Sequence, residues 1–232
     1  MRLFYSPDIS TGTLPEEEAI HAIRVLRLKV NDEIELIDGN GVSAHASISF
    51  INKKKCEFII KETFQAENSL DHLHLAIAPT KSTDRLEWMI EKLTEVGIGS
   101  IHLIVTKRTE RSKINVERLM KKIISAAKQS QKSFFPKLFT YSSLDNFLTS
   151  QSFDQSFIAH LEEDDRIYLS KVMKTSLSTC VLIGPEGDFT LEEIESAKKS
   201  GFKAVTLGDF RLRTETAALF TACSMNNSRY LV

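Results

Sequence analysis

The pattern of apolar and polar residues differs between the first 70 residues and the rest of the chain. In the first region, short apolar runs are separated by turn residues, which is typical of antiparallel strands. The sequence Asp38-Gly39-Asn40-Gly41 predicts a hairpin, because glycine and asparagine tolerate positive φ, and Asn52-Lys53-Lys54 predicts a second turn. We expect strands over Glu33–Asp38, Val42–Phe50 and Cys56–Ile60. Short antiparallel strands of this kind indicate a small barrel over residues 1–70.

One helix interrupts this β-rich module. Thr13-Leu14-Pro15-Glu16 has the form of a capping box with an early proline, so we predict a helix that runs to about Leu28. At helical spacing, its apolar residues share one face, and Arg24 and Arg27 lie on the opposite face. The helix therefore presents a basic outer surface.

Beyond the polar linker Ala66–Ser69, short apolar runs alternate with longer segments of helical period. This alternation predicts an α/β domain over residues 71–232. We expect strands at Leu73–Ala78, Ile101–Val105, Phe157–Ala159, Val181–Ile183 and Ala204–Leu207. We expect helices at Arg85–Val96, Val116–Gln129 and Thr214–Tyr230.

Composition adds mainly exclusions. The 30 Lys and Arg residues nearly cancel the 31 Asp and Glu residues, so any basic surface for a nucleic acid must be local. The cysteines Cys56, Cys180 and Cys223 have neither a disulfide pattern nor a metal-ligand spacing, so we expect reduced thiols and no metal. Without an apolar leader or a run of about 18 apolar residues, the chain is expected to be cytoplasmic and to have no membrane span.

Two glycine loops carry the most informative chemistry, and each follows a predicted strand. Gly184-Pro185-Glu186-Gly187 forms a fixed loop with few side chains, whose backbone groups can approach a flat ligand closely. After this loop, Thr190 and Glu193 predict a capping box for a further helix. Open α/β sheets bind their ligands at such strand ends. The alternative reading is an ordinary tight turn between a strand and a helix.

The second glycine loop runs from Leu207 to Ala217 and brings two arginines and a glutamate to the start of a helix rich in small residues. An arginine such as Arg213 can hold a phosphate or stabilise a developing anion, because its guanidinium stays charged and offers several donors. Arg213 and Glu215 could equally be surface groups or an ordinary ion pair. A third, charge-rich segment, Thr106–Ser112, follows another strand and is a weaker candidate for the same site.

Taken together, these segments resemble the RsmE family of bacterial methyltransferases, which act on N3 of a uridine in 16S ribosomal RNA. The family combines a histidine followed by Val-Leu-Arg, a Gly-Pro-Glu-Gly loop, and a Leu-Gly loop that ends in Leu-Arg-Thr-Glu-Thr. This chain has these motifs in the same order as His21 with Val25-Leu26-Arg27, Gly184-Pro185-Glu186-Gly187, and Leu207-Gly208 with Leu212-Arg213-Thr214-Glu215-Thr216. Glu91–Gly97 and Glu110–Ser112 also look like family segments, so the resemblance covers nearly the whole chain.

The chain departs from the family pattern at three places. Asp188 stands where the family usually has a second glycine, and Phe210 takes the place of the first arginine of the last motif, with Arg211 one position later. The segment Lys128–Lys132 keeps Gln-Ser but lacks the usual acidic, glycine and arginine residues around it. These differences concern individual contacts at the site.

The resemblance implies a SPOUT-type α/β methyltransferase domain with a deep trefoil knot, preceded by a small PUA-like β-barrel domain that helps to bind RNA. It also implies a homodimer with each active site near the subunit boundary. The helix that begins at Thr214 contains many small residues and could pack closely against a second subunit, or could simply belong to the core of one subunit.

The family's activity also assigns roles to residues of this chain. S-adenosylmethionine would be the methyl donor, and loss of the uridine N3 proton would leave negative charge on the base. We hypothesise that Arg213 stabilises that charge or positions the uridine phosphate, and that Glu215 holds Arg213 or assists proton removal. The expected cofactor-binding residues are Thr106, Ile183, Gly184, Pro185, Glu186, Gly187, Leu207, Gly208, Leu212, Arg213 and Thr214.

For the 16S ribosomal RNA, we expect a patch of basic residues that neutralises phosphates. Its members are His21, Arg24, Arg27, Lys53, Lys54, Arg111, Lys128 and Lys132, and Glu162–Asp165 offsets their charge elsewhere. Two other functions stay open. One is a SPOUT enzyme that methylates another base or a ribose, and the other is a ribosome-assembly or RNA-binding protein without catalysis. A dehydrogenase or P-loop enzyme is disfavoured because their glycine motifs are absent from the sequence.

Overall fold

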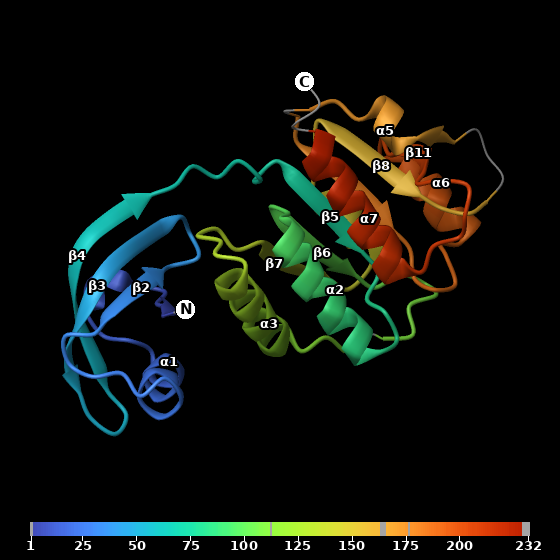
Figure 1. Cartoon of the computed structure of the whole chain (residues 1–232). Helices are drawn as coiled ribbons and strands as arrows, with labels where there is room; N and C mark the ends of the chain where they lie inside the picture. Colours follow the sequence, from blue (N-terminus) through green and yellow to red (C-terminus); the bar gives the residue numbers. More distant parts are fainter. Residues whose placement is uncertain (1, 112, 163–165, 176, 229–232) are drawn as a thin grey trace. The chain divides into compact units, whose positions relative to one another are not determined.

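The structure is a computed structural model that describes residues 2–111, 113–162, 166–175 and 177–228 (Figure 1). Ser112, the acidic residues 163–165 and the predicted helical residues 229–230 lie outside the described residues. The chain forms two compact units. The first runs through Asn68 and also takes Ile124–Phe135, and the second consists of Ser69–Ile123 and the residues from Pro136 onward.

The first unit contains a four-stranded sheet with the order β1-β2-β3-β4. The strands are β1 Leu3–Tyr5, β2 Glu33–Ile37, β3 Val42–Ile51 and β4 Cys56–Gln65. The last three pair in antiparallel fashion, as predicted, and β1 adds to β2 in parallel. Strand β1 was not predicted, because three residues are too few to show an alternation of apolar and polar positions. The side chains of Phe4, Leu36 and Ile48 are almost fully buried between this sheet and the helical segment.

The helical segment of this unit differs from its prediction at both ends. A short 3-10 turn, η1 Ile9–Thr11, precedes α1 Glu16–Ile20, which continues as the π-helix η2 His21–Val25. The predicted capping box is wrong: Pro15 is the N-cap and makes no side-chain cap hydrogen bond, because Thr13 is held in a β-bridge to Glu57. The predicted end at Leu28 is also wrong, since the helix ends at Val25 and Arg27 has a positive φ of 52°.

The second unit is built on a seven-stranded parallel sheet with the order β7-β6-β5-β10-β8-β11-β9. The strands are β5 Leu73–Ile77, β6 Ser100–Ile104, β7 Lys137–Tyr141, β8 Gln155–Ala159, β9 Ile167–Tyr168, β10 Thr179–Ile183 and β11 Lys203–Thr206. The α/β prediction is confirmed. The two missed strands, β7 and β9, form the edges of the sheet and are largely exposed, so they lack the continuous apolar runs of the five inner strands.

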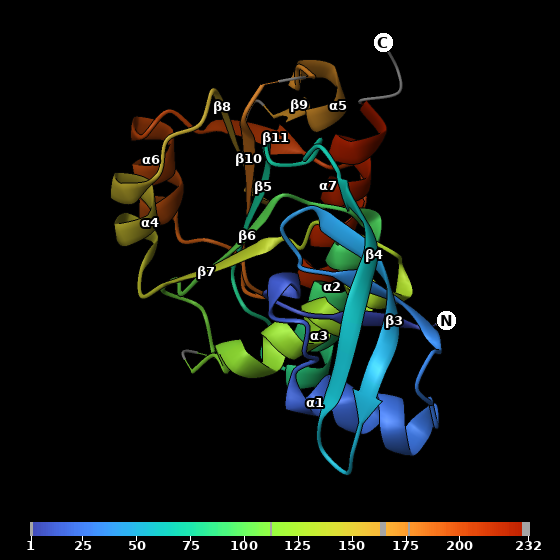
Figure 2. The same cartoon turned by 90° about the vertical axis from the view of Figure 1, so that its left-hand side faces the viewer.

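Helices cover both faces of this sheet (Figure 2). α2 Thr83–Val96 and α7 Thr214–Asn227 pack against each other on one face, and α4 Leu144–Ser150 and α6 Leu191–Lys199 lie together on the other. The remaining helices are α3 Val116–Gln129 and α5 Leu169–Val172. The α6 capping box is confirmed, because Thr190 and Glu193 each accept a hydrogen bond from the other's backbone N–H.

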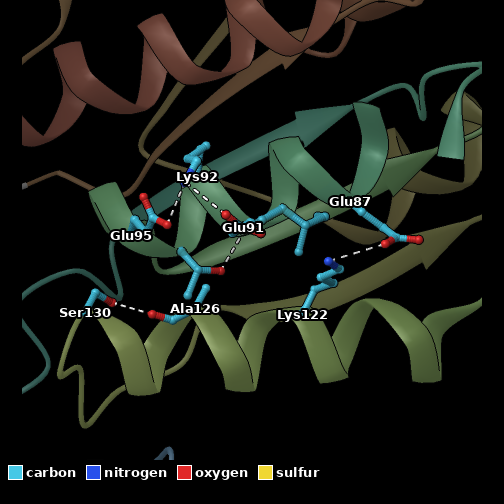
Figure 3. Close-up of polar contacts among 9 residues, drawn as sticks. Glu87, Glu91, Lys92, Glu95, Lys122, Ala126 and Ser130 are labelled. Atoms are coloured by element: carbon cyan, nitrogen blue, oxygen red, sulfur yellow. Dashed lines mark hydrogen bonds and ion pairs between the residues drawn. The ribbon is translucent and has the colours of Figure 1, made fainter. Parts of the chain in front are cut away.

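Charged residues join α2 to the N-terminal half of α3 (Figure 3). The carboxylate of Glu87 is only 8% exposed, and it pairs with Arg118 and, at 3.6 Å, with Lys122. A buried carboxylate is costly unless cations neutralise it, so these partners allow Glu87 to remain inside the helix interface. On the same helix, Lys92 bridges Glu91 and Glu95 at 2.9 and 2.8 Å. Among the described residues, no helix is both long and apolar enough to cross a lipid bilayer.

Candidate functional site

The ends of three neighbouring strands meet at one cavity of about 470 Å³. Strands β10, β8 and β11 are adjacent and parallel, so their carboxyl ends lie on the same edge of the sheet. The loops that follow these strands supply most of the wall, and the first turn of α7 completes it. The lining residues are Ala159, His160, Leu161, Arg166, Ile183, Gly184, Pro185, Glu186, Asp188, Val205, Thr206, Leu207, Gly208, Asp209, Phe210, Arg211, Leu212, Arg213, Thr214 and Ala217.

The first glycine loop is held in place by residues that follow β5 and β6. Arg108 donates hydrogen bonds to the carbonyl oxygens of Gly187 and Phe189, at 2.7 and 3.2 Å. The backbone N–H of Lys81 donates to the carboxylate of Glu186, at 3.1 Å. Hydrogen bonds to charged groups are stronger than neutral ones. The loop is therefore fixed before any ligand arrives.

The unusual Asp188 has a conformational and a bonding role in this loop. Its φ is 61°, a left-handed backbone conformation that suits glycine and that aspartate tolerates better than most residues. Its carboxylate accepts hydrogen bonds from the backbone N–H groups of Leu161 and Phe189, both at 2.8 Å. Asp188 thus meets the backbone requirement of a glycine position and also ties the β10 loop to the β8 loop.

Close packing explains the glycine at position 184. A Cβ there would lie 3.1 Å from the ring of Phe189 and 3.2 Å from Oδ1 of Asp188. The backbone of Gly184 is also joined to the second loop, because the buried hydroxyl of Thr214 donates to its carbonyl oxygen at 3.1 Å. This hydrogen bond connects the β10 loop to the start of α7.

The second glycine loop has fewer anchors and presents its side chains outward. Gly208 has a φ of 152°, and the hydroxyl of Thr206 donates to the carbonyl oxygen of Gly208 at 2.9 Å and accepts from its N–H at 3.3 Å. The hydroxyl of Tyr168 donates to the carboxylate of Asp209, and this bond raises the pKa of Tyr168. Beyond this anchor, Phe210 is 87% exposed. Arg211 is also exposed.

Arg213 and Glu215 have different surroundings. Arg213 is exposed, serves as the N-cap residue of α7 and lines the cavity. Glu215 is buried in the first turn of α7 and pairs at 3.7 Å with Arg85 of α2, so its ion-pair partner is not Arg213. Its second oxygen, Oε2, makes no hydrogen bond within the described part of the chain. Glu215 is not among the residues that line the cavity.

The structure brings most of the expected cofactor-binding residues into this one cavity. They are Ile183, Gly184, Pro185, Glu186, Leu207, Gly208, Leu212, Arg213 and Thr214. Gly187 lies in the same loop without lining the cavity. Thr106 lines a separate cavity of about 450 Å³ beside Ser142, Asp145 and Glu193, because it follows β6, which is two strands away from β10.

Several cavity residues were missed from the sequence. Ala159 is the last residue of β8, His160 and Leu161 follow it, and Arg166 donates to the carbonyl oxygen of His160 at 2.6 Å. The end of β8 has no glycine motif, so only its place between β10 and β11 brings it into the site. The one available sequence signal was the change from the apolar run Phe157–Ala159 to a histidine.

The expected RNA-binding residues have unequal freedom to meet a phosphate. Arg24 and Arg27 are exposed, and His21 is half-buried with its ring in a T-shaped contact with Phe4. The ammonium of Lys128 is bound to both carboxylate oxygens of Glu18, at 2.6 and 2.7 Å.

Of the four remaining members of the predicted patch, Lys53 is exposed, Lys54 pairs with Glu16 at 3.0 Å, and Lys132 and Arg111 are constrained. Burial lowers the pKa of Lys132. Arg111 donates to the backbone carbonyl oxygens of Thr80 and Lys81, at 3.2 and 2.6 Å, so its guanidinium helps to shape the loop after β5.

The chemistry of the cavity suits a ligand that combines a flat ring system with charged groups. Its volume lies within the range of small-molecule sites, which is roughly 300 to 1,000 Å³. Apolar side chains such as Ile183, Val205 and Leu207 can contact a ring, and the glycine backbones allow close approach. The lining carries carboxylates, such as Glu186 and Asp209, and guanidinium groups, such as Arg213, so it suits a ligand with charges of both signs. Among the described residues, no group of three or more His, Cys, Asp or Glu side chains could hold a metal ion.

Comparisons with known proteins agree with this arrangement. The sequence profile of the RNA methyltransferase domain matches residues 66–226, and that of the RNA methyltransferase PUA domain matches residues 14–61. The chain is 30% identical to ribosomal RNA small subunit methyltransferase E of Rickettsia conorii over 209 residues, which cover 89% of this chain and 85% of that protein. The chain therefore belongs to the RNA methyltransferase family that includes ribosomal RNA small subunit methyltransferase E.

Solved structures give the same result for the fold. A probable rRNA-methyltransferase from Porphyromonas gingivalis superposes with a TM-score of 0.94 at 37% identity, covering 100% of this chain and 99% of that chain. A ribosomal RNA small subunit methyltransferase E from Neisseria gonorrhoeae, bound to S-adenosyl methionine, superposes with a TM-score of 0.87 at 27% identity, covering 98% of this chain and 97% of that chain. The predicted SPOUT-type domain and PUA-like module are confirmed at the level of the fold, and the trefoil knot stays a prediction.

Proposed function

We propose that this enzyme transfers a methyl group from S-adenosylmethionine to N3 of a uridine in 16S ribosomal RNA of the small ribosomal subunit. The observation that carries the proposal is the meeting of both glycine loops in one cavity at the ends of β10, β8 and β11. The relatives that match nearly the whole chain support it, since one is a ribosomal RNA methyltransferase bound to this cofactor.

The cavity residues fit the cofactor. The backbones of Ile183–Glu186 and Leu207–Gly208 would hold the adenosine, with the side chains of Leu212 and Thr214 beside it. When bound, S-adenosylmethionine supplies a methyl group on a sulfonium, which is an activated electrophile. The carboxylates of Glu186 and Asp209 line the cavity and would stabilise that positive charge.

Arg213 is the residue that we assign to the uridine. Its exposed guanidinium lines the cavity, where it would stabilise the negative charge that the base acquires when N3 loses its proton. Glu215 does not line the cavity, so we assign it a positioning role: its buried carboxylate pairs with Arg85 and would hold the first turn of α7, where Arg213 is the N-cap residue.

For the substrate, we propose that residues 1–70 form the RNA-binding domain and residues 71–232 the methyltransferase domain. Arg24, Arg27 and Lys53 are exposed members of the basic patch, so they are the first candidates for phosphate contacts. His21, Arg111 and Lys128 would contribute after exchanging their present partners for RNA, and Lys132 after its side chain becomes exposed.

We further propose a homodimer that works in the cytoplasm, where small ribosomal subunits are found. Trp88 of α2 and Phe220 of α7 are 42% and 47% exposed on two helices that pack together. Exposed aromatic side chains are common in subunit interfaces. Replacing either by glutamate should convert the dimer into a monomer in light-scattering measurements of mass.

Two measurements test the function. The purified protein should bind S-adenosylmethionine and its demethylated product in calorimetric titrations. It should also incorporate labelled methyl groups into small subunits that lack the modification, and mass spectrometry should place the methyl group on N3 of a uridine. Cofactor binding with a methyl group on another base or on a ribose would contradict the proposed position. RNA binding without methyl transfer would indicate a protein that retains the fold without catalysis.

A further inference from the structure

One side chain at the cavity is unusually exposed. Phe210 is 87% exposed, the largest exposed fraction among the large hydrophobic side chains of the described residues. It stands on the loop that follows β11 and lines the cavity together with Leu161, which is 45% exposed. A phenylalanine held in solvent contributes little to folding, because its apolar surface stays hydrated.

The backbone around Phe210 is fixed on both sides. Before it, Asp209 accepts a hydrogen bond from the hydroxyl of Tyr168. After it, Thr214 is buried and bonded to the carbonyl oxygen of Gly184. The ring is therefore displayed by an anchored loop, which reduces the entropy lost when a ligand binds to it.

Two cations follow the ring closely. Arg211 and Arg213 are both exposed and both line the cavity. An aromatic ring beside basic side chains is a combination that binds single-stranded nucleic acid, because bases stack on the ring and guanidinium groups meet the phosphates.

We propose that Phe210 is a substrate-binding residue, on which an unpaired nucleobase of the RNA stacks while Arg211 binds an adjoining phosphate. The inference rests on the proposed function and adds the residue that recognises the RNA at the mouth of the site. The buried lining residues, such as Val205 and Ala217, are 1% and 9% exposed, and they enclose the part of the cavity suited to the cofactor. Phe210 contacts mainly solvent, from which the RNA arrives.

The test compares Phe210→Ala with Phe210→Trp, which keeps a ring for stacking. With small subunits that lack the modification, Phe210→Ala should lower kcat/KM on the order of 10- to 100-fold, mainly through KM, because stacking on an aromatic ring contributes this much per base. Phe210→Trp should stay close to the wild-type value, and the affinity of both variants for S-adenosylmethionine should be unchanged. Leu191→Ala is the matched control, since Leu191 is 65% exposed and does not line the cavity.

Three results would overturn the inference. The first is an unchanged kcat/KM in Phe210→Ala. The second is a loss of cofactor affinity in that variant as large as its loss in kcat/KM. The third is a change in its native mass, which would assign the ring to a contact with a second copy of the chain.

An optical measurement separates this inference from the proposed function. The double variant Trp88→Phe, Phe210→Trp has its one tryptophan at position 210, and oligo-uridine should quench its fluorescence. If the double variant is quenched but the wild type does not methylate RNA, the proposed function is rejected and the stacking is kept. If the double variant is not quenched, the stacking is rejected.

Discussion

The two loops of the cavity both have a glycine motif after a strand, but different hydrogen bonds hold them in place. The loop after β10 is fastened from several directions, by Arg108, by the N–H of Lys81 and by the carboxylate of Asp188. The loop after β11 is held by the hydroxyl of Thr206 and by the Tyr168–Asp209 bond, and it leaves Phe210 and both arginines exposed.

This difference suggests a division of labour between the loops. A rigid wall suits a small cofactor, because a preformed site loses little entropy on binding. A loop that displays charged and aromatic groups suits a large RNA, which must find them from solvent. We therefore expect changes in the first loop to act mainly on cofactor affinity and changes in the second loop to act on RNA recognition and turnover.

The largest expected effect concerns the second loop. Arg213→Ala should lower kcat on the order of 100- to 1,000-fold, the usual cost of losing a donor that stabilises a developing anion. Cofactor affinity, measured by calorimetry, should change far less. Arg213→Lys should recover part of the rate, and Lys203→Ala, an exposed charge on β11, should behave like the wild type. An unchanged methylation rate in Arg213→Ala would refute the assignment.

A second prediction concerns His102. This residue lies in β6, the strand that precedes Arg108, which anchors the first loop. Burial lowers the pKa of His102 from 6.5 to about 4. Between these pH values the unfolded chain binds a proton that the folded chain does not, so the free energy of unfolding decreases as pH falls. The neutral side chain of His102 gives its full stabilisation above pH 6.5. Its contribution to the free energy of unfolding falls by about 3 kcal/mol by pH 4.

Urea unfolding at pH 7 and pH 5 measures this effect. In His102→Phe the decrease in stability between the two pH values should be smaller than in the wild type, since the proton-linked loss at this position is gone. His74 also has a pKa lowered by burial, so some dependence on pH should persist. An identical pH dependence in the variant and the wild type would show that His102 does not contribute.

A third prediction tests the anchors of the first loop directly. Arg108→Ala removes the charged donor to Gly187 and Phe189, and it should weaken S-adenosylmethionine binding about tenfold, the equivalent of one strong hydrogen bond. The RNA-dependent KM should change little. The neighbouring control is Lys107→Ala, which removes an exposed ion pair with Glu192 and should have almost no effect. Equal losses in both variants would mean that charge near the loop matters more than its anchoring.

The smallest expected effect concerns the conformation of the same loop. Asp188→Gly keeps a residue suited to the φ of 61° but loses the carboxylate that binds the N–H groups of Leu161 and Phe189. We expect a loss of about 1 kcal/mol in the free energy of unfolding. Asp188→Ala should cost more, because alanine adds strain to the same loss. If both variants lost equal stability in urea unfolding, backbone strain would be unimportant here.

The sequence predicted the parts of the fold that have a clear period. The inner strands and helices such as Val116–Gln129 were located from their apolar runs, whereas the edge strands β7 and β9 were not, because exposed strands lack that signal. The predicted Thr13 capping box is absent, because Thr13 forms a β-bridge with Glu57 and does not cap the helix. Tertiary contacts of this kind leave no trace in local sequence.

The candidate site shows the same limit. Its glycine loops could be found from sequence, since both are short motifs with a conformational reason. The contribution of β8 could not, because it depends on the order β10-β8-β11 in the sheet. For the same reason Thr106 was grouped with the loops and lies in another cavity. The pairing of Glu215 with Arg85 joins two helices far apart in the chain, so it too was not predictable.

The strand order has a consequence for how the enzyme is made. β8 ends at Ala159, but both of its neighbours, β10 and β11, are formed by residues from Thr179 onward. During synthesis, a growing chain that has reached β8 has neither flank of the cofactor site, and the closing helix α7 follows later still. Cofactor binding therefore requires the chain through α7, and truncation before Thr214 should abolish it completely rather than weaken it.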